Sequence, residues 1–374
     1  MKSRAAQLLD LGQSVWLDFI RRDTLKSGEF ERLVRDAGVV GVTSNPTIFQ
    51  NALAESHDYD EQLHELAGRG LEGTALFDAL AFDDIRMACD LLRGTWEKTG
   101  GRDGRVSIEV SPRMAADTGA SIAEGRRLWQ AVSRPNAMIK VPATEAGLGA
   151  ITALTAENIP VNVTLIFSLA RYQQVIDAWM AGLEKCPGPL GDLRSVASFF
   201  VSRVDSKVDK AIDARVATLP PGATERAELE GLRGTAAIAN ARLAYEMFER
   251  SLTGERWRAL AARGAHVQRP LWASTSTKNP AYRDVIYVEE LIGPETVNTM
   301  PPQTLDAFNE HGVVENRIHR DLDAAHALFR RLPELGVPID RLIAELEAEG
   351  VTAFEKSFDT LLAALETRRR EMVA

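Results

Sequence analysis

Charged side chains stand near the ends of short apolar runs that otherwise have the composition of buried strands. Lys140, Glu109 and Asp18 each occupy such a position in a different run. Parallel strands that are covered on both faces consist almost entirely of Val, Ile and Leu, so a charge among them needs a partner or a function. The three residues together predict a nucleophilic amine with acid/base carboxylates beside it.

Lys140 is the candidate nucleophile. An amine attacks a carbonyl carbon only when it is neutral, and burial disfavours the charged form of a lysine. A neutral lysine forms a Schiff base with a ketone, and the protonated imine then accepts the electrons of a neighbouring C–C bond. Glu109 is expected to serve as acid and base, with Thr164 and a water as relay. Asp18 is expected to accept the proton of the substrate hydroxyl whose C–C bond breaks.

Polar residues on other strands predict the substrate contacts. Asn45 follows the second run, Asn162 and Thr164 share one face of the fifth, and Ser198 and Phe200 share one face of the sixth. Taken singly, Asn45 is a turn former and Asn162 is barrel filler. Their occurrence together on several strands favours a site, in which the two asparagines fix substrate hydroxyls.

Two cations near later strand ends predict a phosphate site. Arg203 follows the sixth run and Lys278 follows the seventh, with Ser274 or Ser276 as a hydroxyl donor. The Asn-Pro pair at 279–280 fits the N-cap and the first position of a helix. A helix is therefore expected to begin there with its free N–H groups toward the phosphate. The simpler interpretation is a capped helix with a surface lysine.

Short apolar runs alternate with helical patterns along the chain. This alternation predicts parallel βαβ units, and eight of them fit a closed α/β barrel of the TIM type, (β/α)8, better than an open sheet. Catalytic groups in such a barrel lie at the C-terminal ends of the strands, where the polar residues above are found. The expected strands are Val15–Phe19, Val39–Thr43, Val106–Val110, Ala137–Val141, Pro160–Ile166, Ser195–Val201, Pro270–Ser274 and Thr296–Thr299.

Residues 1–374 are expected to form a single barrel domain. A helical insertion at about residues 207–264 and a C-terminal helical extension at about 313–374 depart from a minimal barrel. Helices are expected over Phe30–Ala37, Ser121–Ser133, Leu169–Lys185 and Gly234–Leu252. A further helix from about Thr352 to Arg369 carries an apolar stripe and is expected to pack near the barrel mouth.

Composition argues against several classes of protein. The net charge is −9 and no basic patch is present, which is untypical of a nucleic-acid binder. Cys89 and Cys186 lack the spacing of a disulfide framework or a zinc site, and no metal or other cofactor is expected. No signal peptide or membrane span is evident. We expect a cytoplasmic enzyme that acts on small molecules as a monomer or homodimer and does not bind membranes.

Several motifs, in their order along the chain, resemble the transaldolase family. They are Gly41-Val-Thr-Ser-Asn45-Pro-Thr-Ile-Phe49, Ser107-Ile-Glu109-Val, Ile139-Lys140-Val-Pro142, Val161-Asn162-Val-Thr164-Leu-Ile-Phe-Ser168 and Ser198-Phe-Phe-Val-Ser-Arg203. Ser14-Val-Trp-Leu-Asp18 and Lys278-Asn279-Pro280 are similar to the longer bacterial subgroup of that family. The resemblance extends from about Ser14 to Pro301.

This resemblance implies a (β/α)8 barrel and a transferase that moves a dihydroxyacetone unit through a lysine Schiff base. Sedoheptulose 7-phosphate and glyceraldehyde 3-phosphate would give erythrose 4-phosphate and fructose 6-phosphate, in the non-oxidative pentose phosphate pathway. Lys278 stands where many members carry arginine. A lysine keeps the positive charge but cannot form the two parallel hydrogen bonds of a guanidinium. The matching residues are Lys140 for the Schiff base, Asp18 and Glu109 for acid/base work, Thr164 as relay, Asn45, Asn162 and Ser198 for substrate, and Arg203 for phosphate.

Two alternatives remain. An aldolase with the same lysine would release dihydroxyacetone instead of transferring it. Glu109 and Phe200 argue against this, because the related fructose 6-phosphate aldolases carry Gln and Tyr at these positions. A catalytically inactive barrel could serve as a binding module, since a fold alone does not define a function. The presence of Lys140, Glu109, Asp18 and Thr164 argues against that alternative.

Overall fold

The computed structural model describes residues 2–373. Within these residues, parallel strands close into a barrel in the order β1 to β8, with β1 paired to β8. The expected (β/α)8 barrel of the TIM type is therefore confirmed. The strands are β1 (Gln13–Leu17), β2 (Val39–Val42), β3 (Arg105–Glu109), β4 (Ala137–Pro142), β5 (Val161–Ile166), β6 (Ser195–Phe200), β7 (Gln268–Ala273) and β8 (Thr296–Met300).

The observed strand ends lie within two residues of the predicted ones. The differences of two residues are at both ends of β1 and at the N-terminal end of β7. The two N-terminal ends begin earlier than predicted because both strands begin on polar residues. Gln13 Nε2 donates a hydrogen bond to the Leu291 carbonyl at 2.8 Å. Gln268 Nε2 donates to Ser195 Oγ at 2.8 Å. These bonds satisfy the buried amide nitrogens of both side chains, so the strands extend beyond the apolar runs that sequence analysis can detect.

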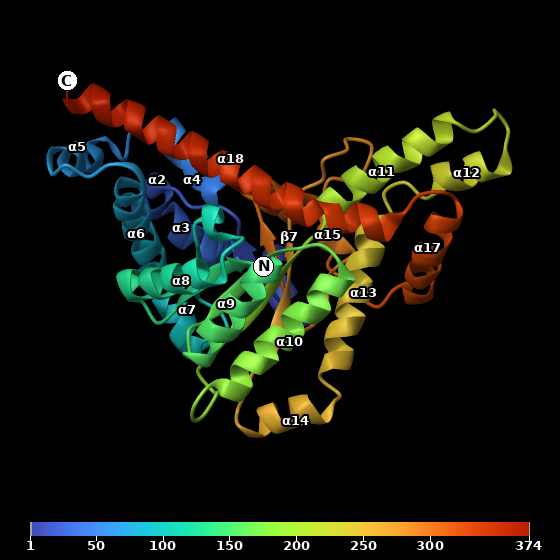
Figure 1. Cartoon of the computed structure of the whole chain (residues 1–374), viewed down its shortest axis with the longest axis horizontal. Coiled ribbons are helices and arrows are strands. Elements are labelled where there is room, and N and C mark those ends of the chain that lie inside the picture. The colour runs from blue at the N-terminus through green and yellow to red at the C-terminus, as the bar shows by residue number, and fades with distance from the viewer. Residues whose placement is uncertain (1, 374) are drawn as a thin grey trace.

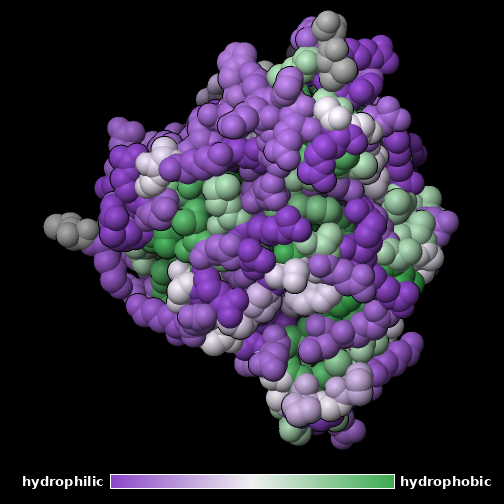
Figure 2. Space-filling model, turned by 90° about the vertical axis from the view of Figure 1, so that its left-hand side faces the viewer, coloured by the Kyte–Doolittle hydropathy of each residue, from purple (hydrophilic) through white to green (hydrophobic). Residues whose placement is uncertain are grey.

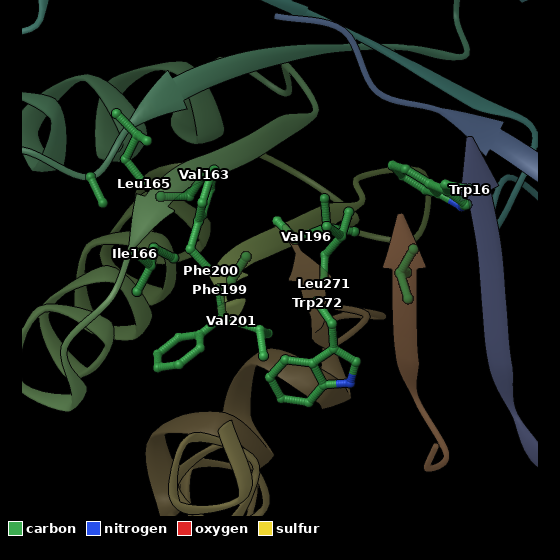
Figure 3. Packing of buried hydrophobic residues seen from close by; sticks show 14 of the residues in the cluster. Trp16, Val163, Leu165, Ile166, Val196, Phe199, Phe200, Val201, Leu271 and Trp272 are labelled. Atoms are coloured by element: carbon green, nitrogen blue, oxygen red, sulfur yellow. The ribbon is translucent and has the colours of Figure 1, made fainter. Parts of the chain in front are cut away.

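Successive strand residues point alternately into the barrel and toward the helices. Trp16 points inward, and a Cβ added to Gly41 would lie 2.6 Å from its ring, so position 41 requires glycine. Phe199 and Trp272 point outward from neighbouring strands and pack edge to face, with ring centroids 6.2 Å apart (Figure 3). Ser198, one residue before Phe199, therefore faces the interior of the barrel.

Helices alternate with the strands around the barrel, as expected. The predicted helices at 121–133 and 169–185 correspond to α8 and α10. The predicted helix at 30–37 is split into α3 and a wider π-helical turn, Leu33–Ala37. The helices outside the insertion and the C-terminal tail are α1 (Arg4–Leu8), α2 (Arg22–Lys26), α3 (Glu29–Arg32), α4 (Pro46–Glu55), α5 (Asp60–Gly68), α6 (Gly73–Leu91), α7 (Arg93–Lys98), α8 (Thr118–Val132), α9 (Glu145–Ala156), α10 (Leu169–Lys185), α15 (Ile286–Glu289) and α16 (Pro302–His311).

The segment between β6 and β7 is helical, as predicted for the insertion. It contains α11 (Ser202–Ala217), α12 (Thr224–Gly231), α13 (Ala236–Ser251) and α14 (Glu255–Ala262). The helix expected at 234–252 is α13, whose stripe of small and aromatic residues is buried. In the C-terminal tail, α17 (Leu322–Glu334) packs against α13 beside the barrel (Figure 1).

The helix expected to begin at residues 279–280 is not formed, and that prediction was wrong. Asn279 Oδ1 accepts a hydrogen bond from the Ala281 amide at 3.0 Å, and the Asn279 carbonyl accepts from the Tyr282 amide at 3.1 Å. The Asn-Pro pair thus begins a turn, which is the other structure that it favours. The helix that follows, α15, begins at Ile286 and has four residues.

The last helix, α18 (Ile339–Val373), crosses the top of the molecule from α17 to the C-terminus (Figure 1). It is longer than the predicted helix and contacts α4, α6, α11 and β5. Its residues Phe354, Phe358, Leu361 and Leu365 are buried. The expected packing of this helix near the barrel mouth is therefore observed.

The surface in Figure 2 is mostly hydrophilic, with hydrophobic atoms visible in small patches between polar side chains. Within residues 2–373, no helix combines the length and the apolar character needed to span a membrane.

Candidate active site

Lys140 and Glu109 face each other inside the barrel. Their Cα atoms are in register on β4 and β3. Lys140 Nζ lies 3.0 Å from Glu109 Oε2, and the two side chains are 5% and 3% exposed. Lys140 Nζ also donates to the Ser44 carbonyl at 3.0 Å. Two adjacent strands thus hold an amine and a carboxylate within proton-transfer distance and away from bulk water.

Glu109 and Thr164 both have hydrogen-bonding capacity to spare. Burial raises the pKa of Glu109, while the positive charge of Lys140 acts in the opposite direction. Within the described residues, Glu109 Oε1 and Thr164 Oγ1 are buried without a hydrogen-bond partner. A carboxyl with a raised pKa can hold a proton and release it, as an acid/base group must.

Asp18 is positioned by two threonines that sequence analysis did not single out as site residues. Thr43 Oγ1 donates to Asp18 Oδ1 at 2.7 Å and lies 2.6 Å from Thr299 Oγ1. Because the Thr43 proton is directed at Asp18, Thr299 is the donor in the second contact. Burial raises the pKa of Asp18, and the charge of Lys140 opposes that effect. The sequence does carry one signal for them, because both threonines stand near the C-terminal ends of predicted strands, where a barrel places its site residues.

Asn162 and Ser198 form a buried hydrogen-bond chain with Ser107. Asn162 Nδ2 donates to Ser107 Oγ at 2.9 Å, and Asn162 Oδ1 accepts from Ser198 Oγ at 2.7 Å. Asn162 is fully buried, whereas Ser198 lines the cavity at the barrel mouth. The structure thus places Ser198 at the cavity wall and Asn162 directly behind it.

Asn45 both caps a helix and borders the cavity. Its Oδ1 accepts a hydrogen bond from the Ile48 amide at 2.9 Å, which caps the N-terminus of α4. The same side chain lines the cavity. The two interpretations of this residue, as a structural residue and as a site residue, are therefore compatible.

A cavity of about 430 Å³ opens at the C-terminal ends of the strands. Glu109 is not among the residues that line this cavity, but it contacts Lys140, which is one of them, at 3.0 Å. Phe354 of α18 completes the wall, with its ring centroid 5.9 Å from Lys140 Nζ, and nothing local in the sequence signals that contact. The predicted site residues that line the cavity are Asp18, Asn45, Lys140, Thr164, Ser198, Phe200, Arg203, Ser274, Ser276 and Lys278.

The cationic end of the cavity contains Arg203 and Lys278. Arg203, in the first turn of α11, places its guanidinium 5.5 Å from the Phe200 ring centroid. Within residues 2–373, its guanidinium forms no hydrogen bond or ion pair, and Lys278 forms no ion pair. Lys278 donates to Ser276 Oγ at 2.7 Å. Burial lowers the pKa of both cations, and Arg203 lowers that of Lys278 further. Two adjacent cations without carboxylate partners suit a phosphate group.

The segment that carries Lys278 is fastened to the start of the insertion. Tyr282 Oη donates to Asp209 Oδ2 at 2.6 Å, and Tyr287 Oη donates to Asp205 Oδ2 at 2.7 Å. Arg203 and Asp205 lie two residues apart, but no ion pair between them is found within the described residues. Ser274, with φ of 56°, turns the chain out of β7 toward Lys278.

The two cysteines lie outside this site. Cys89 and Cys186 are both buried free thiols. Among residues 2–373, no group of three or more His, Cys, Asp and Glu side chains is placed to hold a metal ion.

Comparisons with known proteins identify the family of the chain. The family described as transaldolase/fructose-6-phosphate aldolase matches residues 15–365. The chain is 50% identical to a transaldolase of Frankia alni over 98% of this chain and 97% of the relative. It is 51% identical to transaldolase 1 of Streptomyces coelicolor over 96% of this chain and 93% of that relative. A transaldolase of Mycobacterium tuberculosis is 50% identical over 97% of this chain and 96% of its own length. The chain therefore belongs to the transaldolase/fructose-6-phosphate aldolase family.

Proposed function

We propose that this chain is a transaldolase that transfers a dihydroxyacetone unit between sugar phosphates. In the forward direction, sedoheptulose 7-phosphate and glyceraldehyde 3-phosphate give erythrose 4-phosphate and fructose 6-phosphate. The observation that carries the proposal is the buried contact of 3.0 Å between Lys140 Nζ and Glu109 Oε2, beside a cavity with two cations. The printed names of relatives about 50% identical over nearly the whole chain support the same activity.

The covalent steps follow from the positions of Lys140, Glu109 and Asp18. The neutral amine of Lys140 attacks C2 of the ketose, and the carbonyl oxygen takes up a proton from Glu109 to give a carbinolamine. Loss of water leaves a protonated Schiff base. The C3–C4 bond then breaks, its electron pair moves toward the imine to form an enamine, and Asp18 accepts the proton of the C4 hydroxyl. The aldose product leaves, and the steps run backward with the acceptor aldehyde.

The remaining cavity residues bind and orient the substrate. Arg203 and Lys278, with Ser274 or Ser276, hold the terminal phosphate, so that the carbonyl carbon lies at Lys140. Asn45 and Ser198 contact substrate hydroxyls, with Asn162 as a further contact or as the support of Ser198, and Thr164 relays protons through a water. Orientation of this kind converts an intermolecular reaction into an effectively intramolecular one.

We infer that residues 1–374 form one catalytic domain and that it acts in the non-oxidative pentose phosphate pathway of the cytoplasm, as a monomer or homodimer. The substrates named above are intermediates of that pathway, and this supports the assignment to the pathway. The insertion and the C-terminal helix then belong to the same catalytic unit as the barrel.

Acceptor dependence tests the proposal against the aldolase alternative. Fructose 6-phosphate alone should give little free dihydroxyacetone, and addition of erythrose 4-phosphate should start steady production of sedoheptulose 7-phosphate. The Lys140→Met variant is the control and should be inactive in both assays. Cleavage that is equally fast without an acceptor would make the chain an aldolase. A wild-type protein that turns over neither mixture would be an inactive barrel.

A further inference from the structure

A second cavity, of about 390 Å³, lies at the end of the barrel opposite the candidate active site. The residues that line it include Arg102, Arg194, His266, Arg269 and Glu295. Each of the five precedes a barrel strand or lies at its start: β3, β6, β7 and β8 follow them in the chain. The cavity is thus built at the N-terminal ends of the strands, where the proposed reaction uses no residue.

Positive charge predominates in this second cavity, because three arginines and one carboxylate line it. Arg102 pairs with Glu295 at 2.7 Å, and both side chains remain about 40% exposed, at 38% and 42%. Arg194 has only backbone partners, since its guanidinium donates to the carbonyls of Gly100, Gly191 and Leu193. Within residues 2–373 it forms no ion pair. The charge of Arg194 is therefore not neutralised by a carboxylate in contact with it.

Buried guanidinium groups around this cavity also have unused hydrogen-bond donors. Arg269 is 5% exposed and pairs with Asp103 at 3.2 Å, but its Nε has no partner within residues 2–373. Arg105, the first residue of β3, is 2% exposed and has an unpartnered Nη1 within the same residues. A buried donor without a partner costs free energy, so these guanidinium groups are held beside the cavity at a cost to stability.

The arginines also affect one another. Burial, reinforced by the charge of Arg194, lowers the pKa of Arg105 to about 9. Burial likewise lowers the pKa of Arg194 and of Arg269; Asp192 opposes the effect on Arg194, Asp103 opposes the effect on Arg269, and Arg102 adds to both effects. The guanidinium groups remain charged at neutral pH and repel one another. This local positive charge contrasts with the net charge of −9 of the whole chain.

We propose that this second cavity binds a dianionic phosphate group, either inorganic phosphate or the phosphate ester of a small metabolite. Guanidinium forks match the geometry of phosphate oxygens, and a dianion relieves the repulsion among the arginines. Arg102 exchanges Glu295 for the phosphate, while Arg194 supplies further donors and Arg269 supplies further positive charge. A long polyanion such as a nucleic acid is disfavoured, because the rest of this acidic molecule repels it.

The test is a calorimetric titration with inorganic phosphate against a chloride control of equal ionic strength. It uses the Arg203→Ala variant, in which the phosphate site of the proposed function is weakened. Saturable phosphate binding should persist in the Arg203→Ala variant. The titration therefore measures binding at the second cavity whether or not the proposed function is correct. Addition of Arg102→Gln or Arg194→Gln should weaken phosphate binding at least about fivefold, or roughly 1 kcal/mol.

Glu295→Gln gives the opposite expectation, because it removes the carboxylate that competes with phosphate for Arg102. It should tighten phosphate binding several-fold, which a merely destabilised protein would not show. Arg256→Gln is the matched control, since Arg256 pairs with Asp177 and Glu184 outside the cavity, and it should change nothing. If Arg194→Gln does not fold, Arg102→Gln and Glu295→Gln decide the question.

Two results would overturn the proposal. One is the absence of saturable phosphate binding in the Arg203→Ala background. The other is binding that Arg102→Gln and Glu295→Gln leave unchanged. If binding is found, titration with ribose 5-phosphate identifies its source. Tighter binding of the ester than of inorganic phosphate assigns the site to a metabolite, and the reverse assigns it to inorganic phosphate; either outcome supports the site.

Discussion

Lys140 and Glu109 illustrate how two charges are accommodated inside a parallel barrel. A glutamate in an apolar strand can lie on the solvent-exposed face of an antiparallel sheet, but β3 is parallel to both neighbours and the Glu109 side chain is 3% exposed. The in-register strand pair provides each charge with its partner. Loss of one partner from such a buried pair typically costs about 3 to 5 kcal/mol, so a pair of this kind is a costly feature of a core.

Phe200 is expected to protect the enamine from water. Its apolar ring lines the cavity beside Ser198. A hydroxyl at this position would order water near the intermediate, so Phe200→Tyr should raise the release of dihydroxyacetone from fructose 6-phosphate without an acceptor by roughly tenfold. Phe199→Tyr is the matched control, because Phe199 points away from the cavity and packs against Tyr172 and Trp272. An equal effect of both changes would contradict this role.

Arg203 is expected to bind the substrate phosphate. Its guanidinium lies at the cavity and forms no hydrogen bond within residues 2–373. Arg203→Ala should raise the KM for fructose 6-phosphate by about tenfold or more, and the KM for free dihydroxyacetone donors by much less. Steady-state kinetics with both kinds of donor measure the difference. Equal changes in the two KM values would show that Arg203 holds the structure and not the phosphate.

The elements differ in how far the sequence predicts them. The strands could be predicted because buried parallel strands are continuous apolar runs, and their polar ends marked the site residues. The Asn-Pro pair at 279–280 could not be interpreted correctly, because it suits both a helix start and a turn. The turn is formed here with Tyr282 bonded to Asp209 on α11, a contact between segments far apart in the sequence.

Helix α18 is expected to contribute to catalysis as well as to stability. Phe354 and Phe358 lie one turn apart and are 4% and 3% exposed, but only Phe354 lines the cavity above Lys140. Either change to alanine should cost about 3 to 5 kcal/mol of unfolding free energy. Under conditions in which both variants are folded, Phe354→Ala should lower kcat far more than Phe358→Ala. An equal loss of activity in both variants would show that α18 supports the structure and does not contribute to catalysis.

At the scale of the molecule, the candidate site is assembled from segments spread from Asp18 to Phe354. The strand residues could be predicted, because the C-terminal ends of all barrel strands converge on one face. Phe354, Thr43 and Thr299 were missed, because a place in an apolar stripe or at a strand end does not reveal which neighbour a side chain meets. The arginines of the second cavity were missed for the same reason, since they precede strands that meet only in the closed barrel.

The stability of the molecule should depend on pH through Asp78, which joins α6 to α8. Burial raises the pKa of Asp78 from 3.8 to about 6, although Arg127 lies 2.8 Å away. A carboxyl with a raised folded-state pKa contributes stability at low pH and loses it as the pH rises through that value. Between about pH 4 and pH 7, the wild type should therefore lose up to roughly 3 kcal/mol relative to Asp78→Asn. Denaturant unfolding of both proteins across this range measures the difference, and a constant difference would refute the prediction.

The central claim is that Lys140 carries the covalent intermediate, and borohydride trapping tests it most directly. The protein is incubated with fructose 6-phosphate, reduced with borohydride, digested and mapped by mass spectrometry, with Lys140→Met as the control. The account predicts a reduced dihydroxyacetone adduct on the peptide that contains Lys140 and no adduct in the control. An adduct on another lysine such as Lys278, or an unlabelled wild-type protein that still turns over its substrates, would contradict it.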